Sequence, residues 1–433
     1  ILGLVGSDGK GIEGLELEYE NELKGSSQKV TIRRDARGRP LMNDGLLFTE
    51  NKDGADLRLT IDSEIQYYLE SELKNTVREF DADGAVGIVL DAKTSAVLAV
   101  ADAMKSENES KDQAGIRRNR ALTDAFEPGS VMKTFVIASG IREKMIQPNT
   151  KFFCENGSFK VGDRIIKEAE SQEKFGNLSV SEILAVSSNI GTTKIAMSLG
   201  AQLLASSLTS FGFGEKSGVD FPGESKGIVQ QLPWRPHLLA NISFGHGIAA
   251  TPLQIANAYA AIANGGVLKT PFMVESIHTP GEGIASADVL RKRHHLERRI
   301  LSEEQAKQIR IMLTAVTADG GTGVNARVNG FAVAGKTGTA QKVNPHGRGY
   351  LTGQYISSFG GFLPANDPRF VIFVAVDSPR TEYYSAKVAA PLFSRIASYC
   401  VQQDGIAPTW IADEGTKKYT TEKLISGVTK EIS

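Results

Sequence analysis

Ser130 and Lys133 are three residues apart at the start of a mostly apolar stretch, 131–145. Pro128 and Gly129 interrupt the preceding segment, so this stretch is predicted to form a helix that begins at the serine. Residues three apart share one face of a helix, which places the lysine amine beside the serine hydroxyl. A lysine that burial keeps neutral can accept the serine's proton. The pair therefore predicts a serine nucleophile with its own base, and no histidine is needed.

The same Ser-x-x-Lys spacing also occurs at Ser7, Ser26, Ser71 and Ser171. On its own it equally describes a serine that caps a helix, followed by a solvated lysine. Two further segments decide between these readings.

The first is Ser187-Ser188-Asn189, which lies between two predicted helices, 180–186 and 190–199. In such a junction Ser187 can relay a proton and the Asn189 amide can hold a substrate carbonyl. A similar Ser-x-Asn at 106–108 lies in a charged loop, where we expect no function.

The second is Lys336-Thr337-Gly338-Thr339, on a predicted strand, 331–341. The similar tripeptide Lys216-Ser217-Gly218 lies in a glycine-rich segment that is predicted to be a loop. A lysine on a strand can present a fixed positive charge to a substrate carboxylate. The context therefore favours Lys336 over Lys216.

The residues that follow Lys336 are predicted to bind substrate. Thr337 and Thr339 offer hydroxyl and backbone N–H groups, and Gly338 is expected to leave room for a ligand beside the strand. The N–H groups of Thr339 and Ser130 are expected to form an oxyanion hole, which contributes about 10²–10³ in rate per donor.

Apolar periodicity, with capping boxes at Ser179, Thr251 and Ser302 that mark helix starts, predicts an α+β fold. A hairpin near the start is expected to pair with strands hundreds of residues later, giving an antiparallel sheet with helices on its faces and an all-helical insertion between. The predicted strands are 56–61, 85–90, 96–101, 331–341, 355–363 and 370–376, and the predicted helices include 63–80, 131–145, 180–186, 252–263, 303–319 and 386–402.

Composition excludes several classes of protein. The net charge of −1 argues against a nucleic-acid-binding surface, and no apolar run reaches the roughly 18 residues of a membrane span. The six histidines and two cysteines show no metal-ligand spacing, so no metal or other cofactor is expected. His246 is expected to be a packed or hydrogen-bonded loop residue, and Cys154 and Cys400 to be inert.

Three regions are expected along the chain. Residues 1–54 are too poor in apolar side chains for a core of their own, so they are predicted to be part of a non-catalytic accessory module. Residues 55–410 are predicted to form the catalytic domain, and 411–433 a tail. The sequence begins at Ile1 without Met, so we expect a portion of a longer protein.

The three motifs, in this order, resemble the signature of penicillin-binding proteins and class A β-lactamases. Four other segments resemble class B penicillin-binding proteins, closest to the septal (cell-division) transpeptidase: Arg118–Ser130, Leu59–Asp62, Ser243–Gly247 with Thr251–Gln254, and Ala389–Phe393. The match covers about residues 10–400. Two features depart from the family: its usual Thr-Gly-Glu hairpin is Thr94-Ser95-Ala96 here, and a charged stretch, 105–113, replaces a Pro/Asn-rich segment.

The resemblance implies the transpeptidase fold, a five-stranded antiparallel sheet flanked by helices with an all-helical subdomain. It also implies a peptidoglycan D,D-transpeptidase in which Ser130 forms an acyl-enzyme with a stem peptide ending in D-Ala-D-Ala. Lys133 would accept the proton, Ser187 and Lys336 would help pass one to the leaving D-Ala, and Asn189 would hold the donor. Lys336, Thr337 and Thr339 would bind the terminal carboxylate.

The resemblance further implies partners and a location. β-Lactams would mimic the donor, and a membrane glycan polymerase with division-complex proteins would be the partners, on the periplasmic face of the inner membrane. The alternatives are a β-lactam-hydrolysing enzyme or D,D-carboxypeptidase, which would use water as acceptor, and a β-lactam sensor domain.

Overall fold

The computed structural model describes residues 1–25, 35–37, 53–105, 118–170, 172–280, 283–286, 297–345, 347 and 349–408. The chain forms two compact units. Unit 1 consists of Ile1–Thr60, Asp220–Pro222 and Phe272–His295, and unit 2 of Ile61–Val219, Gly223–Pro271 and Leu296–Ser433. The charged stretch after residue 105 and the tail 411–433 lie outside the described residues.

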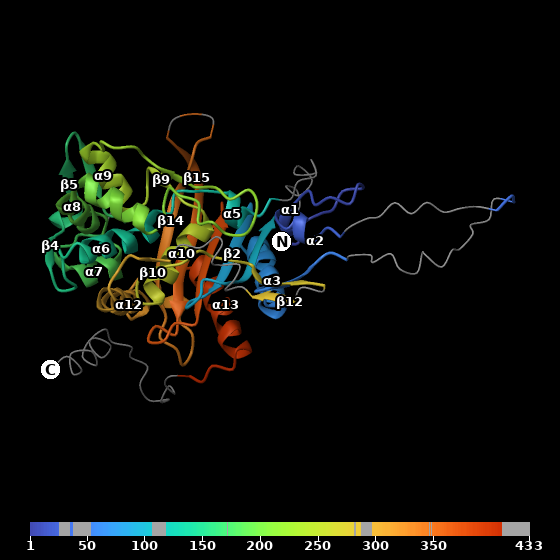
Figure 1. Cartoon of the computed structure of the whole chain (residues 1–433). Helices are drawn as coiled ribbons and strands as arrows, with labels where there is room; N and C mark the ends of the chain where they lie inside the picture. The colour runs from blue at the N-terminus through green and yellow to red at the C-terminus, as the bar shows by residue number, and fades with distance from the viewer. Residues whose placement is uncertain are drawn as a thin grey trace. The chain divides into compact units, whose positions relative to one another are not determined.

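The centre of unit 2 is a five-stranded antiparallel sheet with the order β14-β15-β16-β2-β3 (Figure 1). Its register pairs Phe370 with Asp91 and Asp377 with Gly84, so an early hairpin continues a sheet built almost 300 residues later. This confirms the sheet predicted from the sequence. The strands are β2 (Gly84–Asp91), β3 (Val97–Met104), β14 (Ala334–Val343), β15 (Tyr350–Leu363) and β16 (Phe370–Asp377).

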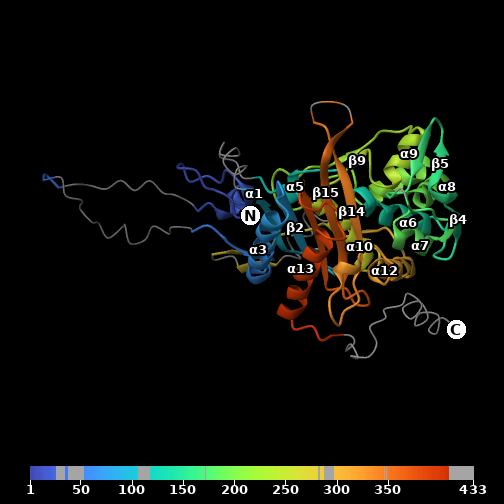
Figure 2. The same ribbon diagram turned by 180° about the vertical axis from the view of Figure 1, so that it is seen from behind.

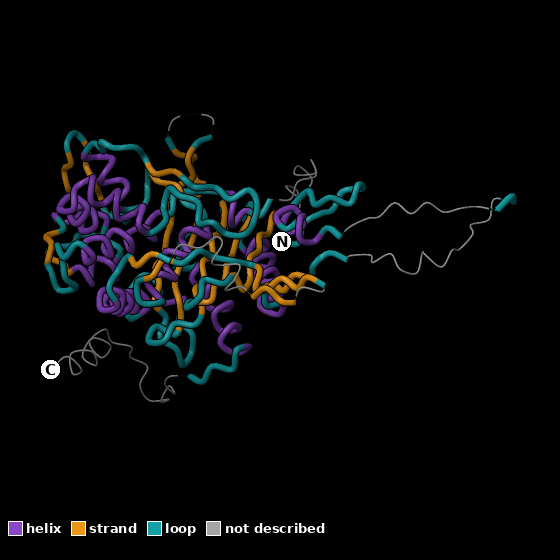
Figure 3. Tube along the Cα trace, viewed as in Figure 1, coloured by secondary structure: helices purple, strands orange, loops and turns teal. Residues whose placement is uncertain are grey.

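Helices cover both faces of this sheet (Figures 2 and 3). On one face lie α3 (Ser63–Glu79) and α13 (Ala389–Gln403), and α10 (Pro252–Ala263) lies on the other. Glycines allow the close approach. A Cβ on Gly87 would lie 2.6 Å from Leu69 of α3, and one on Gly360 would lie 2.7 Å from Tyr259 of α10. The apolar strand β16, buried from Phe370 to Val376, is therefore covered on both sides.

An insertion between β3 and β14 holds most of the remaining helices. The capping boxes predicted at Ser179, Thr251 and Ser302 are confirmed, because each side chain and its partner three residues on exchange hydrogen bonds with the backbone. The helices and 3₁₀ turns are α5 (Arg120–Thr123), η2 (Gly129–Val131), α6 (Met132–Arg142), η3 (Glu155–Gly157), α7 (Val180–Val186), α8 (Asn189–Ser210), α9 (Pro236–Ser243), α12 (Glu303–Thr317) and η4 (Val324–Ala326).

Three details of the insertion differ from the sequence prediction. Helix α8 continues to Ser210, past the predicted end at residue 199, across a kink at Gly200 with φ of 76°. Helix α6 ends at Arg142, about three residues early, because Lys144 takes a left-handed conformation with φ of 58°. The insertion also contains short paired strands, too brief to show a period: β4 (Lys151–Phe153) with β7 (Asn177–Ser179), β5 (Ser158–Val161) with β6 (Arg164–Lys167), β8 (Ile228–Val229) with β9 (Ile248–Ala249), and β10 (Val267–Leu268) with β13 (Arg298–Arg299).

Unit 1 is small, and three of its segments are held together by a half-buried carboxylate. Asp220 accepts hydrogen bonds from the backbone N–H groups of Met273 (2.7 Å) and Val274 (2.9 Å) and from the Tyr19 hydroxyl (2.9 Å). The elements of unit 1 are α1 (Gly14–Glu18), α2 (Glu20–Leu23) and the sheet β1 (Asp56–Leu59), β11 (Val274–Thr279) and β12 (Gly283–Ser286). In the part of the chain that the structure describes, no helix combines the length and apolarity needed to cross a bilayer.

The turn between β2 and β3 carries a strained serine. Ser95 adopts φ of 63°, the conformation that glycine takes at least cost, at the position where the resembled family usually has glycine. Its hydroxyl is buried and has no hydrogen-bond partner among the described residues. The turn is held instead by Asp91, whose carboxylate accepts from the backbone N–H groups of Lys93 (3.0 Å) and Thr94 (2.7 Å).

We expect Ser95→Gly to raise the free energy of unfolding by about 1 kcal/mol. Relief of the left-handed strain, roughly 1–2 kcal/mol, should exceed the entropy that glycine adds to the unfolded chain. Denaturant unfolding measures the change. Ser95→Ala removes only the unsatisfied hydroxyl and should fall between the two proteins; a glycine variant less stable than wild type would contradict the strain argument.

Candidate functional site

Ser130 lies in the 3₁₀ turn η2, immediately before α6, and is half-buried. Two glycines let this turn pack tightly on its surroundings. Gly129 takes φ of 57° and donates its N–H to the Gly245 carbonyl (3.2 Å), and a Cβ on Gly245 would lie 2.0 Å from the Gly129 carbonyl oxygen. The serine is therefore held by backbone contacts on a short, rigid turn.

Lys133, one turn further on, is completely buried. Its amine donates to the Ser187 hydroxyl (3.1 Å) and also contacts the Ser187 carbonyl oxygen. Burial lowers the pKa of Lys133 to about 7, against the opposing effect of Glu168 and Glu173. The neutral amine required of a base is thus well populated near neutral pH, as the sequence predicts.

The Ser187 turn joins α7 to α8. Ser187 ends α7 in the left-handed conformation, with φ of 63°, and Ser188 caps α8 by accepting from the Gly191 N–H (2.9 Å). Asn189 is the first residue of α8, and its side-chain amide donates to the Lys167 carbonyl (3.0 Å). The turn brings Ser187 against Lys133, although 54 residues separate them in sequence.

Lys336 lies on β14, the edge strand of the sheet, and is also completely buried. Its amine donates to the carbonyl (3.2 Å) and hydroxyl (3.1 Å) of Thr337. The sequence predicts a fixed positive charge here, but burial, and then the nearby Lys133, hold the pKa of Lys336 well below its ordinary value. A carboxylate beside it would favour the charged form, so the charge depends on the anion.

Thr337 and Thr339 connect β14 to two other segments. The Thr337 hydroxyl lies 2.9 Å from that of Thr322. The Thr339 hydroxyl donates to Ser385 (3.0 Å) and accepts from the Ser385 N–H (3.2 Å). These contacts hold both threonines in place beside Lys336.

Gly338 has a different role from the one predicted. A Cβ there would lie 2.6 Å from both Val131 and Ser358 and 2.8 Å from the Pro128 carbonyl oxygen. The space is filled by the protein itself, so the glycine allows η2 to pack on β14 and leaves no room for a ligand on that side.

The rival tripeptide at Lys216 lies in a loop, as predicted. Lys216 is exposed, and the N–H groups of Ser217 (2.6 Å) and Gly218 (3.1 Å) bind the buried carboxylate of Glu224. The structure thus places Lys336, and not Lys216, beside Lys133.

Three acidic residues near the site carried no signal in the sequence. Glu168 accepts from Ser188 and Asn189, and Glu173 lies close enough to influence Lys133. Glu127 accepts from the Gly247 N–H (2.7 Å) and bonds the His246 ring (2.7 Å). His246 is therefore the hydrogen-bonded loop residue that the sequence predicts.

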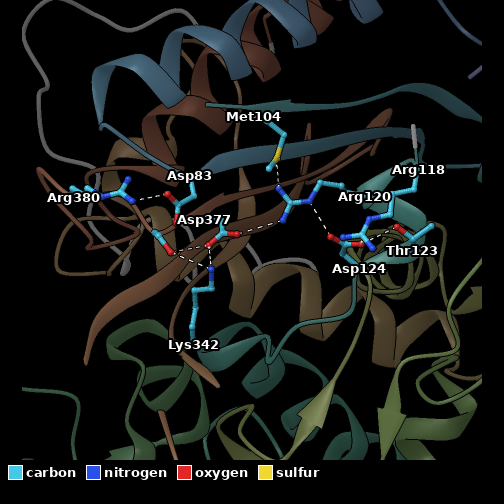
Figure 4. Close-up of polar contacts among 10 residues, drawn as sticks. Asp83, Met104, Arg118, Arg120, Thr123, Asp124, Lys342, Asp377 and Arg380 are labelled. Carbon is cyan, nitrogen blue, oxygen red and sulfur yellow. Dashed lines mark hydrogen bonds and ion pairs between the residues drawn. The ribbon is translucent and has the colours of Figure 1, made fainter. Parts of the chain in front are cut away.

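An ion-pair network fixes the chain that leads to Ser130 (Figure 4). Arg120 of α5 donates to Asp124 (2.9 Å) and to Asp377 (3.3 Å) at the end of β16. Lys342 of β14 lies 2.6 Å from the same Asp377, although β15 separates the two strands. One carboxylate thus joins two strands and the approach to the nucleophile.

Within the described ranges, no group of His, Cys, Asp and Glu side chains is placed to hold a metal ion.

Comparison with known proteins identifies relatives along most of the chain. A family model described as the penicillin binding protein transpeptidase domain matches residues 85–398. Stage V sporulation protein D of Bacillus subtilis is 34% identical over 94% of this chain, which spans 63% of that protein. Peptidoglycan D,D-transpeptidase FtsI of Escherichia coli is 30% identical over 94% of this chain and 66% of its own length.

Solved structures of penicillin-binding proteins are also similar to this chain. Penicillin binding protein 3 from Mycobacterium tuberculosis, complexed with ampicillin, superposes with a TM-score of 0.81 and 29% identity, covering 96% of this chain and 89% of that one. The transpeptidase domain of Burkholderia pseudomallei penicillin-binding protein 3 gives a TM-score of 0.69 and 33% identity, covering 81% and 98%.

The buried Lys133 predicts a pH-dependent stability. Its pKa is about 7 in the folded protein and 10.5 ordinarily, so between these values the unfolded chain binds more protons and stability rises with pH. Lys133→Met removes this dependence and should be more stable than wild type near neutral pH. The difference should shrink by about 1.4 kcal/mol per pH unit as the pH rises toward 10. Denaturant unfolding across this range measures it; a constant difference would mean that the buried lysine keeps its charge.

Proposed function

The chain belongs to the penicillin binding protein transpeptidase family, and we propose that it is a serine-type D-Ala-D-Ala transpeptidase that cross-links peptidoglycan stem peptides in septal wall synthesis. One observation carries the proposal: the amine of Lys133 is buried and bonded to Ser187, one turn from Ser130. Ser187 of the second motif bonds this amine, and Lys336 of the third lies near enough to be influenced by it. The similarity to transpeptidase relatives along 94% of the chain supports the same assignment.

In the acylation step, the Ser130 oxygen attacks the carbonyl carbon of the penultimate D-Ala while neutral Lys133 takes its proton. The N–H groups of Ser130 and Thr339 stabilise the oxyanion. The carbon–nitrogen bond then breaks, and the proton passes from Lys133 through Ser187 to the amine of the leaving D-Ala, with Lys336 assisting. The product is an ester between the stem peptide and Ser130.

In the second step, an amine of a neighbouring stem peptide attacks this ester. The amine loses its proton to Lys133, the ester bond breaks, and Lys133 passes that proton to the Ser130 oxygen, which restores the hydroxyl. The new amide is the cross-link. Because both steps use the same proton acceptor, the amine of Lys133 must alternate between neutral and charged forms, which a pKa of about 7 permits.

Two walls of the site recognise the substrate: strand β14 and the start of α8. The terminal carboxylate of the donor binds beside Lys336, whose charged form it favours, and to the hydroxyls of Thr337 and Thr339. The Asn189 amide holds the donor peptide from the other wall. A β-lactam carries a carboxylate and a reactive amide in a similar arrangement, so we propose that it acylates Ser130 and inhibits the enzyme.

We further propose that residues 1–54 belong to a non-catalytic module, whose compact unit also takes in β1 and two later segments. Residues 55–410 then form the transpeptidase domain, and 411–433 a tail. The module would present a surface to a membrane glycan polymerase and division-complex proteins, at the periplasmic face of the inner membrane.

We expect Ser130→Ala to abolish covalent labelling by penicillin without changing the circular dichroism spectrum, because no other residue is the nucleophile. Mass spectrometry of the labelled, digested wild-type protein should find one adduct, on the peptide that contains Ser130, and the adduct should persist for hours. Ser187→Ala is the matched control: it should still be labelled at Ser130, about 10²–10⁴ times more slowly.

An adduct on the Ser130→Ala protein, or one that maps to Ser187, would overturn the assignment. An adduct that hydrolyses within seconds would indicate a β-lactam-hydrolysing enzyme instead. Failure to form cross-links from a labelled stem peptide and an amine acceptor, with a persistent adduct, would indicate a sensor.

A chain that starts at Gly54 should be acylated by penicillin within about a few-fold of the full-length rate. It keeps β1, which pairs with β11, and it keeps every motif residue. Its association with membrane partners should weaken. Stopped-flow acylation and a thermal melt test this; a shortened protein that melts cooperatively but cannot be acylated would assign a catalytic role to the N-terminal residues.

A further inference from the structure

Glu168 belongs to none of the three motifs, yet it contacts one of them and faces another. We propose that Glu168 is a positioning residue for the transpeptidase reaction: it anchors the turn that carries Ser187 and Asn189, and it places a negative charge beside Lys133. The inference rests on the proposed function, because it concerns the same serine and lysine.

The anchoring is direct. Glu168 follows β6, and only 7% of it is exposed. One carboxylate oxygen accepts from the Ser188 hydroxyl (2.7 Å), and the other accepts from the Asn189 backbone N–H (2.6 Å). The neighbouring Lys167 carbonyl accepts from the Asn189 side chain (3.0 Å). Two adjacent residues thus bind both residues that follow Ser187, and the two carboxylate bonds are of the strong, charge-assisted kind.

The position of this carboxylate explains why it is stable while almost buried. It lies at the N-terminus of α8, a helix of 22 residues, where unpaired N–H groups and the helix dipole favour negative charge. The Asn189 N–H is one of the donors that have no partner within the helix, and Glu168 supplies its acceptor. Ser188 accepts from Gly191 and donates to Glu168, so the cap and the carboxylate form one chain of hydrogen bonds.

By anchoring Ser188 and Asn189, Glu168 also fixes the position of Ser187, which bonds the Lys133 amine. Ser187 is fixed on one side by the end of α7 and on the other by the anchored start of α8. Its left-handed conformation directs both its hydroxyl and its carbonyl to the Lys133 amine. Displacement of Ser188 would therefore displace both hydrogen bonds of Lys133.

The charge of Glu168 acts on the same amine. Lys133 is faced by Glu168 from the segment after β6, by Glu173 from the segment before β7, by Ser187 from the α7–α8 turn and by Lys336 from β14. Burial lowers the pKa of Lys133, and Glu168 is the stronger of the two acidic groups that oppose it.

This opposition matters because a base works best when its pKa is near the working pH. Without Glu168, Lys133 would be neutral at pH 7 but a weaker proton acceptor. Cys154, whose sulfur lies 3.6 Å from the Ser188 hydroxyl, is a further titratable neighbour of Glu168. Burial together with Glu168 raises the pKa of its thiol, so it adds no charge near neutral pH.

Three variants separate anchoring from charge. Glu168→Gln keeps the shape and removes the charge. Glu168→Asp keeps the charge and shortens the reach. The control is Glu224→Gln, since Glu224 is also 7% exposed and also accepts two hydrogen bonds, but from the backbone of the Lys216 loop, away from every motif.

Two measurements are made on the full chain. The first is the rate of acylation by penicillin between about pH 5 and about pH 9, which gives a plateau and the midpoint of the acidic limb. The second is a ¹³C NMR titration of the Lys133 side chain without ligand, with the resonance identified by its loss in Lys133→Ala.

In Glu168→Gln we expect both midpoints to fall by about one pH unit or more, the effect of removing a nearby opposite charge. The plateau should fall as well, because the lysine becomes a weaker base. In Glu168→Asp the midpoints should stay near those of wild type, because the charge is kept. The plateau should fall by up to about 100-fold, because the shorter side chain no longer reaches Ser188 and the turn is no longer anchored. Glu224→Gln should match wild type in both.

Midpoints in Glu168→Gln equal to those of wild type would overturn the proposal, and so would a Glu168→Asp plateau equal to that of wild type. If Glu168→Gln does not fold, Glu168→Asp still decides by its plateau. If the wild-type protein is not acylated at all, the proposed function fails, and the NMR midpoint of Lys133 in Glu168→Gln still tests the influence of Glu168.

Discussion

The burial of one amine, that of Lys133, is the constraint on which the site depends. A lysine held away from water loses its charge most readily where few opposite charges lie near it. Here it is enclosed by α6, the Ser187 turn and β14, and it has two hydrogen bonds, both to Ser187. Each of these elements must be in place for Ser130 to have a base, so the chemistry is available only in the folded protein.

The enclosure requires that the backbone of η2 pack closely on two other segments. Gly338 and Gly245 permit this, since a side chain on either would collide with the turn that carries Ser130. Gly338, the glycine of the third motif, therefore serves packing. A rigid nucleophile turn is the result, and accurate placement of the reacting atoms is a large part of catalytic power.

Two buried lysines destabilise the folded chain, and the apolar sheet offsets them. Lys133 and Lys336 are both completely buried, and burial disfavours the charged form of each amine. The core beneath them is formed by strands from both ends of the domain, with helices packed on both faces. The catalytic groups thus lie where a stable sheet can hold them against their own tendency to be solvated.

Local patterns in the sequence predict the candidate catalytic residues and most of the helices and strands. Ser130 and Lys133, taken with the motifs at Ser187 and Lys336, predicted a nucleophile and its base; the apolar run Phe370–Val376 predicted a strand, and three capping boxes marked helix starts within a residue. These features are local, because periodicity and capping depend on neighbours a few residues apart. The sheet pairing also followed, since only a few antiparallel arrangements satisfy the strand order.

Other properties of the site depend on contacts between segments that are far apart in the chain. The state of charge of Lys336, the reason for Gly338 and the presence of Glu168 in the site could not be read from the sequence. Glu168 is one acidic residue among many until α8 presents its N-terminus to it, and the space beside Gly338 belongs to Val131, more than 200 residues away. Burial and long-range packing set these properties, and neither leaves a local pattern in the chain.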